Sequence, residues 1–223
     1  KKIGDNSALS IEGTYTKTTG LGALRDVNYF VNGVRPFSQF GRASMRQSIA
    51  ESEYKALFVR FERRFRGDHQ YLLSYTLSDA SEDTQGLPPD QTILTNLNGP
   101  AGADRRHRFI ASGMGMIPAG IQLSGIASYN SSTPFNAHSG LDLNSDGRGS
   151  DYISGVSYNQ GCRGLSLSTV NAYRASQGLS AASEAECPTF VNIDLRATKT
   201  WEIGRNFRLE TIAQVFNLFN RDN

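Results

Sequence analysis

The sequence lacks any long apolar run, and this absence excludes the commonest way of crossing a membrane. No stretch of about 18 consecutive apolar residues occurs in it, so no transmembrane helix is expected. The first residues, KKIGDNSALS, lack the apolar centre and the small-residue cleavage site of a signal peptide, which indicates a mature chain or a piece of one. A membrane protein built from strands is compatible with this absence. Strands of transmembrane barrels alternate apolar and polar residues and give only a weak hydropathy signal.

An excess of charge of one sign is also absent. Lys and Arg number 23 and Asp and Glu number 21, for a formal net charge of +2. Basic residues cluster in RFERRFR and DRRHR, but acidic residues lie close by. A surface for phosphate backbones needs a continuous basic stripe. We therefore expect no nucleic-acid partner.

Groups for catalysis are few. The three histidines fall on an expected turn (His69), at the start of an expected strand (His107) and in a long loop (His138). Nothing pairs them with a nucleophile and an orienting acid at a recognisable spacing. No glycine-rich phosphate loop follows a strand and opens a helix. The chain is therefore not expected to be an enzyme, and no cofactor is expected apart from the calcium considered below.

What the sequence does have is alternation with period two. In one segment, for example, Ile121, Leu123 and Ala127 alternate with Gln122 and Ser124. Strict alternation over eight or so residues is typical of a strand with two different faces. The expected strands cover about residues 8–18, 49–65, 69–78, 107–117, 121–129, 191–198 and 207–215.

The connections between these seven expected strands alternate between short and long. RGDH, IPAG and EIGRN are tight hairpin turns, in which Gly supplies a positive φ or Pro fixes the corner. The other connections, about residues 20–46, 79–106 and 130–188, are far longer than usual in a compact domain. Outer-membrane barrels have this layout, with short periplasmic turns and long extracellular loops. We predict an all-β, antiparallel, up-and-down transmembrane β-barrel of the bacterial outer membrane, present in part, with about seven strands.

The charged residues of these strands share one face. A buried core could not hold them, because unpaired buried charge is very costly. A soluble sandwich could expose that face to water, whereas in a barrel it would line the lumen. The expected lumen-facing residues are Arg60, Glu62, Arg64, Arg108, Asp194, Arg196, Arg208 and Glu210.

Aromatic residues favour the barrel over the sandwich. They gather at two heights, as in the aromatic girdles of membrane barrels. Phe65, Tyr71, Trp201 and Phe207 lie near the tight turns, and Tyr15, Tyr54, Tyr75 and Tyr129 lie toward the long loops.

The two cysteines, Cys162 and Cys187, fall in the longest loop. In an extracytoplasmic protein, two thiols in one exposed loop predict a disulfide that closes it. A metal pair is disfavoured, because no His or further Cys lies at ligand spacing. Between the cysteines, STVNAYRASQG predicts a short helix ended by Gly178, a lid on the loop.

The stretch DLNSDGRGSD resembles the start of a calcium loop. Asp142, Asn144 and Asp146 are spaced by two, and a glycine follows for the sharp turn. Ile153 stands at the twelfth position, where a bidentate Glu is expected, and Asp151 could replace it only if the loop closes earlier. An Asx-rich turn in a polar loop is the simpler interpretation, and calcium is the competing hypothesis.

Longer stretches of the chain resemble a known family. YLLSYTLSDA, the segment from DRRHRF through SSTPFN to DLNSDG, and the segment from NIDLRATKTW to VFNLFNR resemble the C-terminal barrel of TonB-dependent outer-membrane receptors. The likeness is greatest to the Oar-like subgroup, whose members often carry an N-terminal carboxypeptidase-regulatory-like domain. It covers most of residues 54–223, and DRRHRF, SSTPFN and VFNLFNR are its most specific pieces. Residues 1–45 match by pattern only.

The resemblance implies a 22-stranded barrel with an N-terminal plug domain, and a TonB box that couples it to inner-membrane energy. It implies uptake of a scarce ligand (a siderophore, an oligosaccharide or a peptide) bound by extracellular loops. The expected partners are outer-membrane lipid, the small ligand and the TonB system through the plug. This chain shows no plug or TonB box, and seven strands cannot close a bacterial barrel of even strand number. We therefore interpret residues 1–223 as the C-terminal part of one barrel domain of a longer protein, and completion of the wall by another chain is the alternative. The alternatives are a surface-display or adhesion barrel and a soluble calcium-binding β-sandwich.

Overall fold

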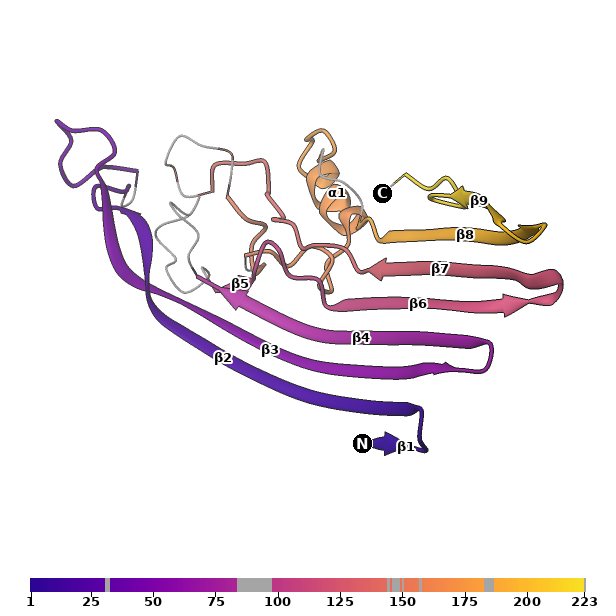
Figure 1. Cartoon of the computed structure of the whole chain (residues 1–223). Helices are drawn as coiled ribbons and strands as arrows, with labels where there is room; N and C mark the ends of the chain where they lie inside the picture. Colours follow the sequence, from indigo (N-terminus) through magenta and orange to yellow (C-terminus); the bar gives the residue numbers. More distant parts are fainter. Residues whose placement is uncertain are drawn as a thin grey trace.

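The strands of the chain form one continuous antiparallel sheet (Figure 1). The computed structural model describes residues 1–30, 33–83, 98–143, 145, 149, 151–156, 158–182 and 187–222. The order across the sheet is β1-β2-β3-β4-β6-β7-β8-β9, with β5 paired to β4 beside this path. The strands are β1 (Lys2–Ile3), β2 (Ser7–Asp26), β3 (Ser44–Arg66), β4 (His69–Glu82), β5 (Gly99–Pro100), β6 (His107–Ile117), β7 (Ile121–Asn130), β8 (Phe190–Ile203) and β9 (Phe207–Val215). Neighbours along the chain are thus neighbours in the sheet, as in an up-and-down barrel wall.

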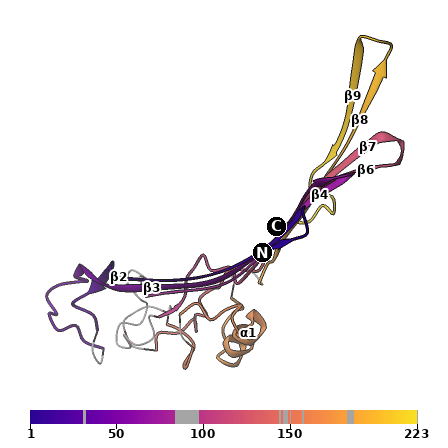
Figure 2. The same cartoon turned by 60° about the horizontal axis from the view of Figure 1, so that its bottom comes forward.

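The tight turns lie at one end of the sheet and the long connections at the other (Figure 1). Gly67 (φ 74°) and Gly204 (φ 68°) supply the left-handed conformation in two of the turns. Between β6 and β7 a 3-10 turn (Pro118–Gly120) places Ala119 at φ 71°. At the loop end, the loop segments and the helix α1 (Leu167–Ser176) lie to one side of the sheet (Figure 2). Among the described residues, no helix is long and apolar enough to cross a membrane.

The predicted all-β architecture is confirmed, but the count and the extent of the strands need correction. The sheet has nine strands instead of seven, because β1 and β5 are two-residue pairings too short to show alternation. The β2–β3 hairpin also continues to Asp26 and Ser44, so its connection spans 27–43 instead of about 20–46. Likewise β4 extends to Glu82 and β8 to Ile203. Backbone pairing continues beyond the last residue of strict apolar–polar alternation, so the alternation underestimates the length of these strands.

Among the described residues, the sheet buries no large hydrophobic side chain on either face. Every residue of β9 is exposed, and the large side chains Phe207, Ile11 and Trp201 are 76%, 65% and 46% exposed. The largest fully buried side chains, Val170, Asn28, Asp151 and Ser139, all belong to the loops. A soluble sandwich would bury one face of each sheet against the other. Here the strands form a single sheet, so the sandwich alternative is wrong.

Strand register separates the two faces of the sheet. Residues directly opposite one another in adjacent strands share a face. One row runs from Ile11 through Val59, Tyr75 and Phe109 to Tyr129, and it belongs to the apolar face. The residues directly before and after each member of this row point to the opposite face of the sheet, which is called the charged face below.

One aromatic residue of the predicted girdle, Tyr54, does not lie on the apolar face that a girdle requires. Tyr54 pairs with Thr16 and Ala80, whereas Tyr15 pairs with Lys55 on the apolar face. Side chains alternate along a strand, so Tyr54 shares the face of Arg60. Tyr54 lies near the long loops, at the height of the predicted aromatic girdle, but the alternation of side chains along β3 places it on the charged face.

Candidate functional site: the loop end and the charged face

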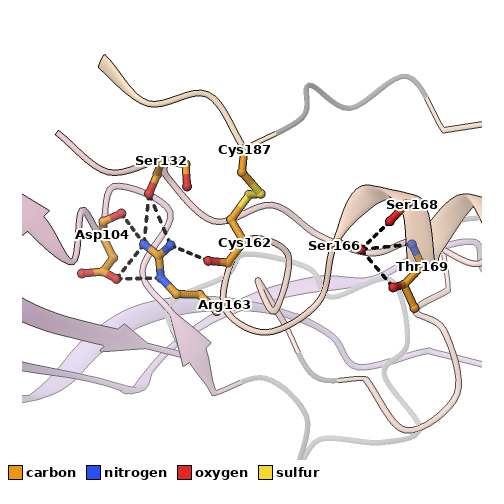
Figure 3. Close-up of a disulfide and its surroundings, with 8 residues drawn as sticks. All are labelled: Asp104, Ser132, Cys162, Arg163, Ser166, Ser168, Thr169 and Cys187. Carbon is orange, nitrogen blue, oxygen red and sulfur yellow. Dashed lines mark hydrogen bonds and ion pairs between the residues drawn. A yellow bond between two sulfur atoms is a disulfide. The ribbon is translucent and has the colours of Figure 1, made fainter. Parts of the chain in front are cut away.

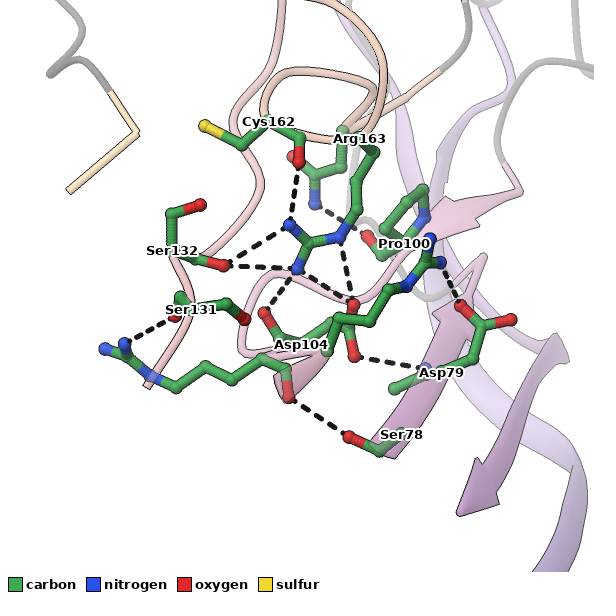
Figure 4. Close-up of polar contacts among 12 residues, drawn as sticks. Ser78, Asp79, Pro100, Asp104, Ser131, Ser132, Cys162 and Arg163 are labelled. Carbon is green, nitrogen blue, oxygen red and sulfur yellow. Dashed lines mark hydrogen bonds and ion pairs between the residues drawn. The ribbon is translucent and has the colours of Figure 1, made fainter. Parts of the chain in front are cut away.

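A buried ion pair joins two connections at the loop end, the one between β4 and β6 and the one between β7 and β8 (Figure 4). The Arg163 and Asp104 side chains are only 5% and 0% exposed, and their closest N–O distance is 2.9 Å. The Arg163 guanidinium donates to Asp104 Oδ2 through Nε and Nη2, and to the Asp104 carbonyl at 2.8 Å. It also donates to the carbonyls of Ser132 and Cys162. A buried charge is tolerable only with such a full set of partners.

The same junction is held by further contacts of neighbouring residues. Arg105 Nη1 donates to the Ser131 carbonyl at 3.0 Å, and the His107 backbone N–H donates to Ser131 Oγ at 3.1 Å. Asn159 Nδ2 donates to the Pro100 carbonyl at 2.9 Å. The structure therefore brings together DRRHRF and SSTPFN, two of the most specific motifs of the sequence, although they lie on opposite sides of the β6–β7 hairpin.

The predicted disulfide is confirmed. Cys162 and Cys187 are bonded across 25 positions of sequence (Figure 3). Cys162 precedes Arg163, so the covalent bond closes the loop directly beside the buried ion pair. The disulfide and the ion pair therefore fix the same point of the chain.

The predicted helix is present as α1, within the segment closed by the disulfide. Ser166 Oγ accepts from the Thr169 backbone N–H at 3.2 Å, which is a standard N-terminal cap (Figure 3). Gly178 (φ 71°) follows the helix. Val170 of α1 is fully buried against Ala137 and Ile153. The helix is therefore part of a small apolar core within the longest loop, rather than only a lid over it.

The connection between β2 and β3 has a polar core of its own. The Asn28 side chain is 1% exposed and donates from Nδ2 to the carbonyls of Phe37, Phe40 and Gly41 at 2.9–3.1 Å. Its Oδ1 accepts from the Phe37 backbone N–H at 2.9 Å. Asn28 thus fixes the backbone of this loop while the Phe37 and Phe40 rings stay exposed.

Asp26 anchors this loop to the sheet and makes it sensitive to acid. Burial tends to raise the pKa of Asp26, but hydrogen bonds from Ala43 N and Asn28 N and the Arg35 guanidinium outweigh it, so the pKa lies below 3.8. A carboxyl group with a lowered folded-state pKa stabilises the fold above its unfolded pKa, and this stabilisation is lost as the pH falls through the folded value.

We therefore expect the loop at 27–43 to open only below about pH 4, the pKa of a free aspartate. Pepsin cleavage after Phe37 or Phe40, followed from about pH 5 down to about pH 2, checks this. In Asp26→Asn the same cleavage should already occur at the upper end of the range. Equal cleavage of the two proteins at every pH would contradict the anchoring role.

The calcium hypothesis stays a prediction. Asn144 and Asp146 lie outside the described residues. Asp151 is 1% exposed and its Oδ2 accepts from the Leu143 backbone N–H at 2.6 Å. In the described part of the chain, no cluster of three or more His, Cys, Asp or Glu residues could hold a metal. Asp151 therefore has a structural contact that closes this turn, as an Asx-rich turn requires.

The expected lumen-facing residues share one face of the sheet by register. Cross-strand pairing aligns Arg60 with Ser74, Glu62 with Leu72 and Arg196 with Gln214, all on the charged face. Alternation along each strand places the remaining residues of the predicted set on this face as well. They are Arg64, Arg108, Asp194, Arg208 and Glu210.

Part of this face is hollowed. A cavity of about 580 Å³ is lined by residues of β3, β4, β6, β7, β8 and β9, among them Arg60, Glu62, Arg64, Asp194 and Arg196. Side chains from six strands thus meet at one hollow, and that this face lines the lumen of the barrel stays a prediction. The other three residues of the predicted set lie elsewhere on the same face.

The family model for the outer membrane beta barrel domain matches residues 3–223. The chain belongs to this family. No curated protein and no solved structure matches it. The match agrees with the single up-and-down sheet, with its tight turns at one end and its long loops at the other.

Membership of the outer membrane beta barrel domain family places the protein in the bacterial outer membrane. In the described residues, β1 and β9 are paired on one side only, so these strands form part of a barrel wall. The barrel domain therefore carries the predicted lumen-facing residues and the hollow on one face, and the apolar row from Ile11 to Tyr129 on the other.

The residues that organise the loop end of the barrel domain could not be recognised from the sequence. Asn28, Asp104 and Arg163 are polar residues in polar loops, where most such residues are solvated. The only signal was the position of Asp104 at the start of DRRHRF, one of the motifs specific to the resemblance. Burial alone distinguishes these residues, and burial depends on three connections that are far apart in the sequence.

Proposed function

We propose that the chain is the barrel wall and the ligand-facing loops of a TonB-dependent outer-membrane transporter. The transporter imports a scarce ligand, such as a siderophore, an oligosaccharide or a peptide. The observation that carries this proposal is a loop end of fixed shape beside a charged, hollowed inner face. The resemblance of DRRHRF, SSTPFN and VFNLFNR to receptors of this kind supports it.

The fixed shape of the loops favours ligand binding over simple anchoring. Ordering a loop upon binding costs free energy, and a preorganised loop avoids this cost. Here the Arg163–Asp104 pair, the disulfide and the Asn28 hydrogen bonds each hold a loop backbone in place. A barrel that only anchored its loops would need none of these contacts.

The partners follow from the two faces. The apolar face contacts outer-membrane lipid, with Trp201 near the tight turns. Trp201 Nε1 donates to Thr211 Oγ1 at 3.0 Å, and Lys199 Nζ lies 4.0 Å from the centre of the Trp201 ring. Aromatic and basic residues of this kind are typical of the membrane–water interface. The TonB system engages the transporter through an N-terminal plug.

Uptake measurements test the transport proposal. Cells carrying the full protein are given labelled ferric siderophores, oligosaccharides and short peptides in parallel. We expect deletion of the gene to abolish high-affinity uptake of one class, and a protonophore to abolish it equally, because TonB-dependent transport needs inner-membrane energy. Uptake that is lost on deletion but survives the protonophore would indicate a passive barrel instead.

Surface adhesion is the second candidate function, and one observation favours it. Val34, Phe37 and Phe40 in the β2–β3 connection are 62%, 57% and 63% exposed, an apolar tip held by Asn28. Exposed apolar groups of this kind mark contact surfaces. Replacing Val34, Phe37 and Phe40 with serine separates the two functions. Adhesion predicts that cell-surface binding is lost while ligand uptake persists.

A further inference from the structure

We infer that the hollow on the charged face is a binding site for an amphipathic anion, a ligand with a phosphate or carboxylate on a short apolar body. This inference rests on the proposed transport function, since it takes the hollow to lie on the path of the ligand. It names the chemical class of that ligand. Three features of the hollow support this: an excess of positive charge, arginines with donors to spare, and apolar walls.

The carboxylates of the hollow are already occupied. Glu62 accepts from Arg60 at 3.0 Å and lies 3.8 Å from Arg64, so one acid serves two cations. Asp194 Oδ1 accepts from the Asn217 backbone N–H at 2.8 Å, which fixes the turn after β9. Neither acid makes an ion pair with Arg196, which lines the same hollow.

Arg196 and Arg64 have hydrogen-bond donors to spare. Arg196 Nε donates weakly to Thr198 Oγ1 at 3.4 Å, and no carboxylate of the described residues lies within ion-pair distance of its guanidinium. The Arg64 side chain is 83% exposed, and its contact with Glu62 is long. A guanidinium carries five N–H donors in a planar fork that matches a phosphate or carboxylate. These two side chains are the anion-binding residues of the proposal.

The rest of the lining is largely apolar. Leu72, Met114, Ile126 and Phe216 contribute side chains to the hollow beside the arginines. Its volume, about 580 Å³, falls within the range usual for small-molecule sites. An inorganic anion would leave these side chains wet, and a neutral apolar molecule would leave the guanidinium groups without a partner. A ligand with an anionic group and an apolar body would contact both the guanidinium groups and the apolar side chains of the hollow.

The test uses three six-carbon probes that differ only in their head group: hexyl phosphate, hexanol and hexylammonium. The full protein in phosphatidylcholine nanodiscs is titrated by calorimetry, with empty nanodiscs as the background. We expect saturable binding of hexyl phosphate, no saturable binding of the other two, and a weaker affinity at higher salt because exposed charges are screened. No saturable binding of hexyl phosphate, or equal binding of hexanol, would overturn the inference.

Variants assign the binding to the arginines. Arg196→Gln should weaken hexyl phosphate binding about fivefold, a value discounted for the exposure of the group, and Arg196→Lys should restore part of it. Arg64→Gln combined with Arg196→Gln should abolish saturation, and Arg196→Glu should shift the preference toward hexylammonium. Arg208→Gln is the matched control, because Arg208 shares the face but pairs with Glu202 outside the hollow. Unchanged affinity in the double variant would overturn the assignment.

This binding assay needs no inner-membrane energy, so it separates the two proposals. Saturable binding without energy-dependent uptake in cells would overturn the transport function and leave the anion site. Energy-dependent uptake by a protein that fails to bind hexyl phosphate would overturn the anion site and leave the transport function.

Discussion

Replacing Arg163 with methionine is expected to open the loop end of the barrel domain, at a cost of about 3–5 kcal/mol. Methionine fills much of the same space but leaves the fully buried Asp104 carboxylate without its cation. The carbonyl of Ser132 loses its donors at the same time. Hydrogen exchange measured by mass spectrometry should show faster exchange at 98–106, 131–136 and 158–165, with the strands unchanged.

The matched control for this variant is Arg106→Met. Arg106 lies two positions after Asp104 and pairs with Asp79 at 2.7 Å, but both side chains are substantially exposed. Exposed pairs of this kind contribute about 0–1 kcal/mol. We expect no change in exchange at the loop end. If Arg163→Met and Arg106→Met behaved alike, the buried pair would not be what holds the two connections together.

The sheet could be predicted from the sequence because its physics is local. A strand that separates lipid from a polar interior must alternate residue by residue, and this pattern survives without knowledge of any neighbour. The strands β6 and β9 were predicted with the observed bounds, since the turn chemistry marks one end and the alternation stops at the other. The part of the β2–β3 hairpin next to its connection, up to Asp26 and Ser44, was not predicted. Backbone pairing continues there beyond the strict apolar–polar alternation.

The loop end could be predicted only where chemistry leaves few choices. With two cysteines in the chain, one pairing was available, and the disulfide was predicted correctly. The partner of Arg163 was not predictable in this way, since the chain has 21 acidic residues and Asp104 lies 59 positions away. Asn28 shows the same limit, because its role depends on carbonyls that only the folded loop brings around it.

Removing the disulfide is expected to have the second largest effect. In the chain-entropy model, the bond across 25 positions contributes about 3 kcal/mol against disorder of the loop. In the double variant Cys162→Ser/Cys187→Ser, the small core of Val170, Ala137 and Ile153 must hold α1 on its own. Three buried side chains are too few for this, so exchange at α1 should become fast.

The barrel strands should not respond to loss of the disulfide. Their ladders of hydrogen bonds lie outside the closed segment, so the heat-induced change in gel mobility of the full protein should occur at an unchanged temperature. Ser166→Ala is the matched control, because it removes only the cap of α1 and should cost about 1 kcal/mol. Unfolding of the sheet together with the loop in the cysteine variant would show that the disulfide stabilises the wall itself. An effect confined to the loop means instead that the bond maintains the shape of the ligand-facing surface, which is the property that the transport proposal requires.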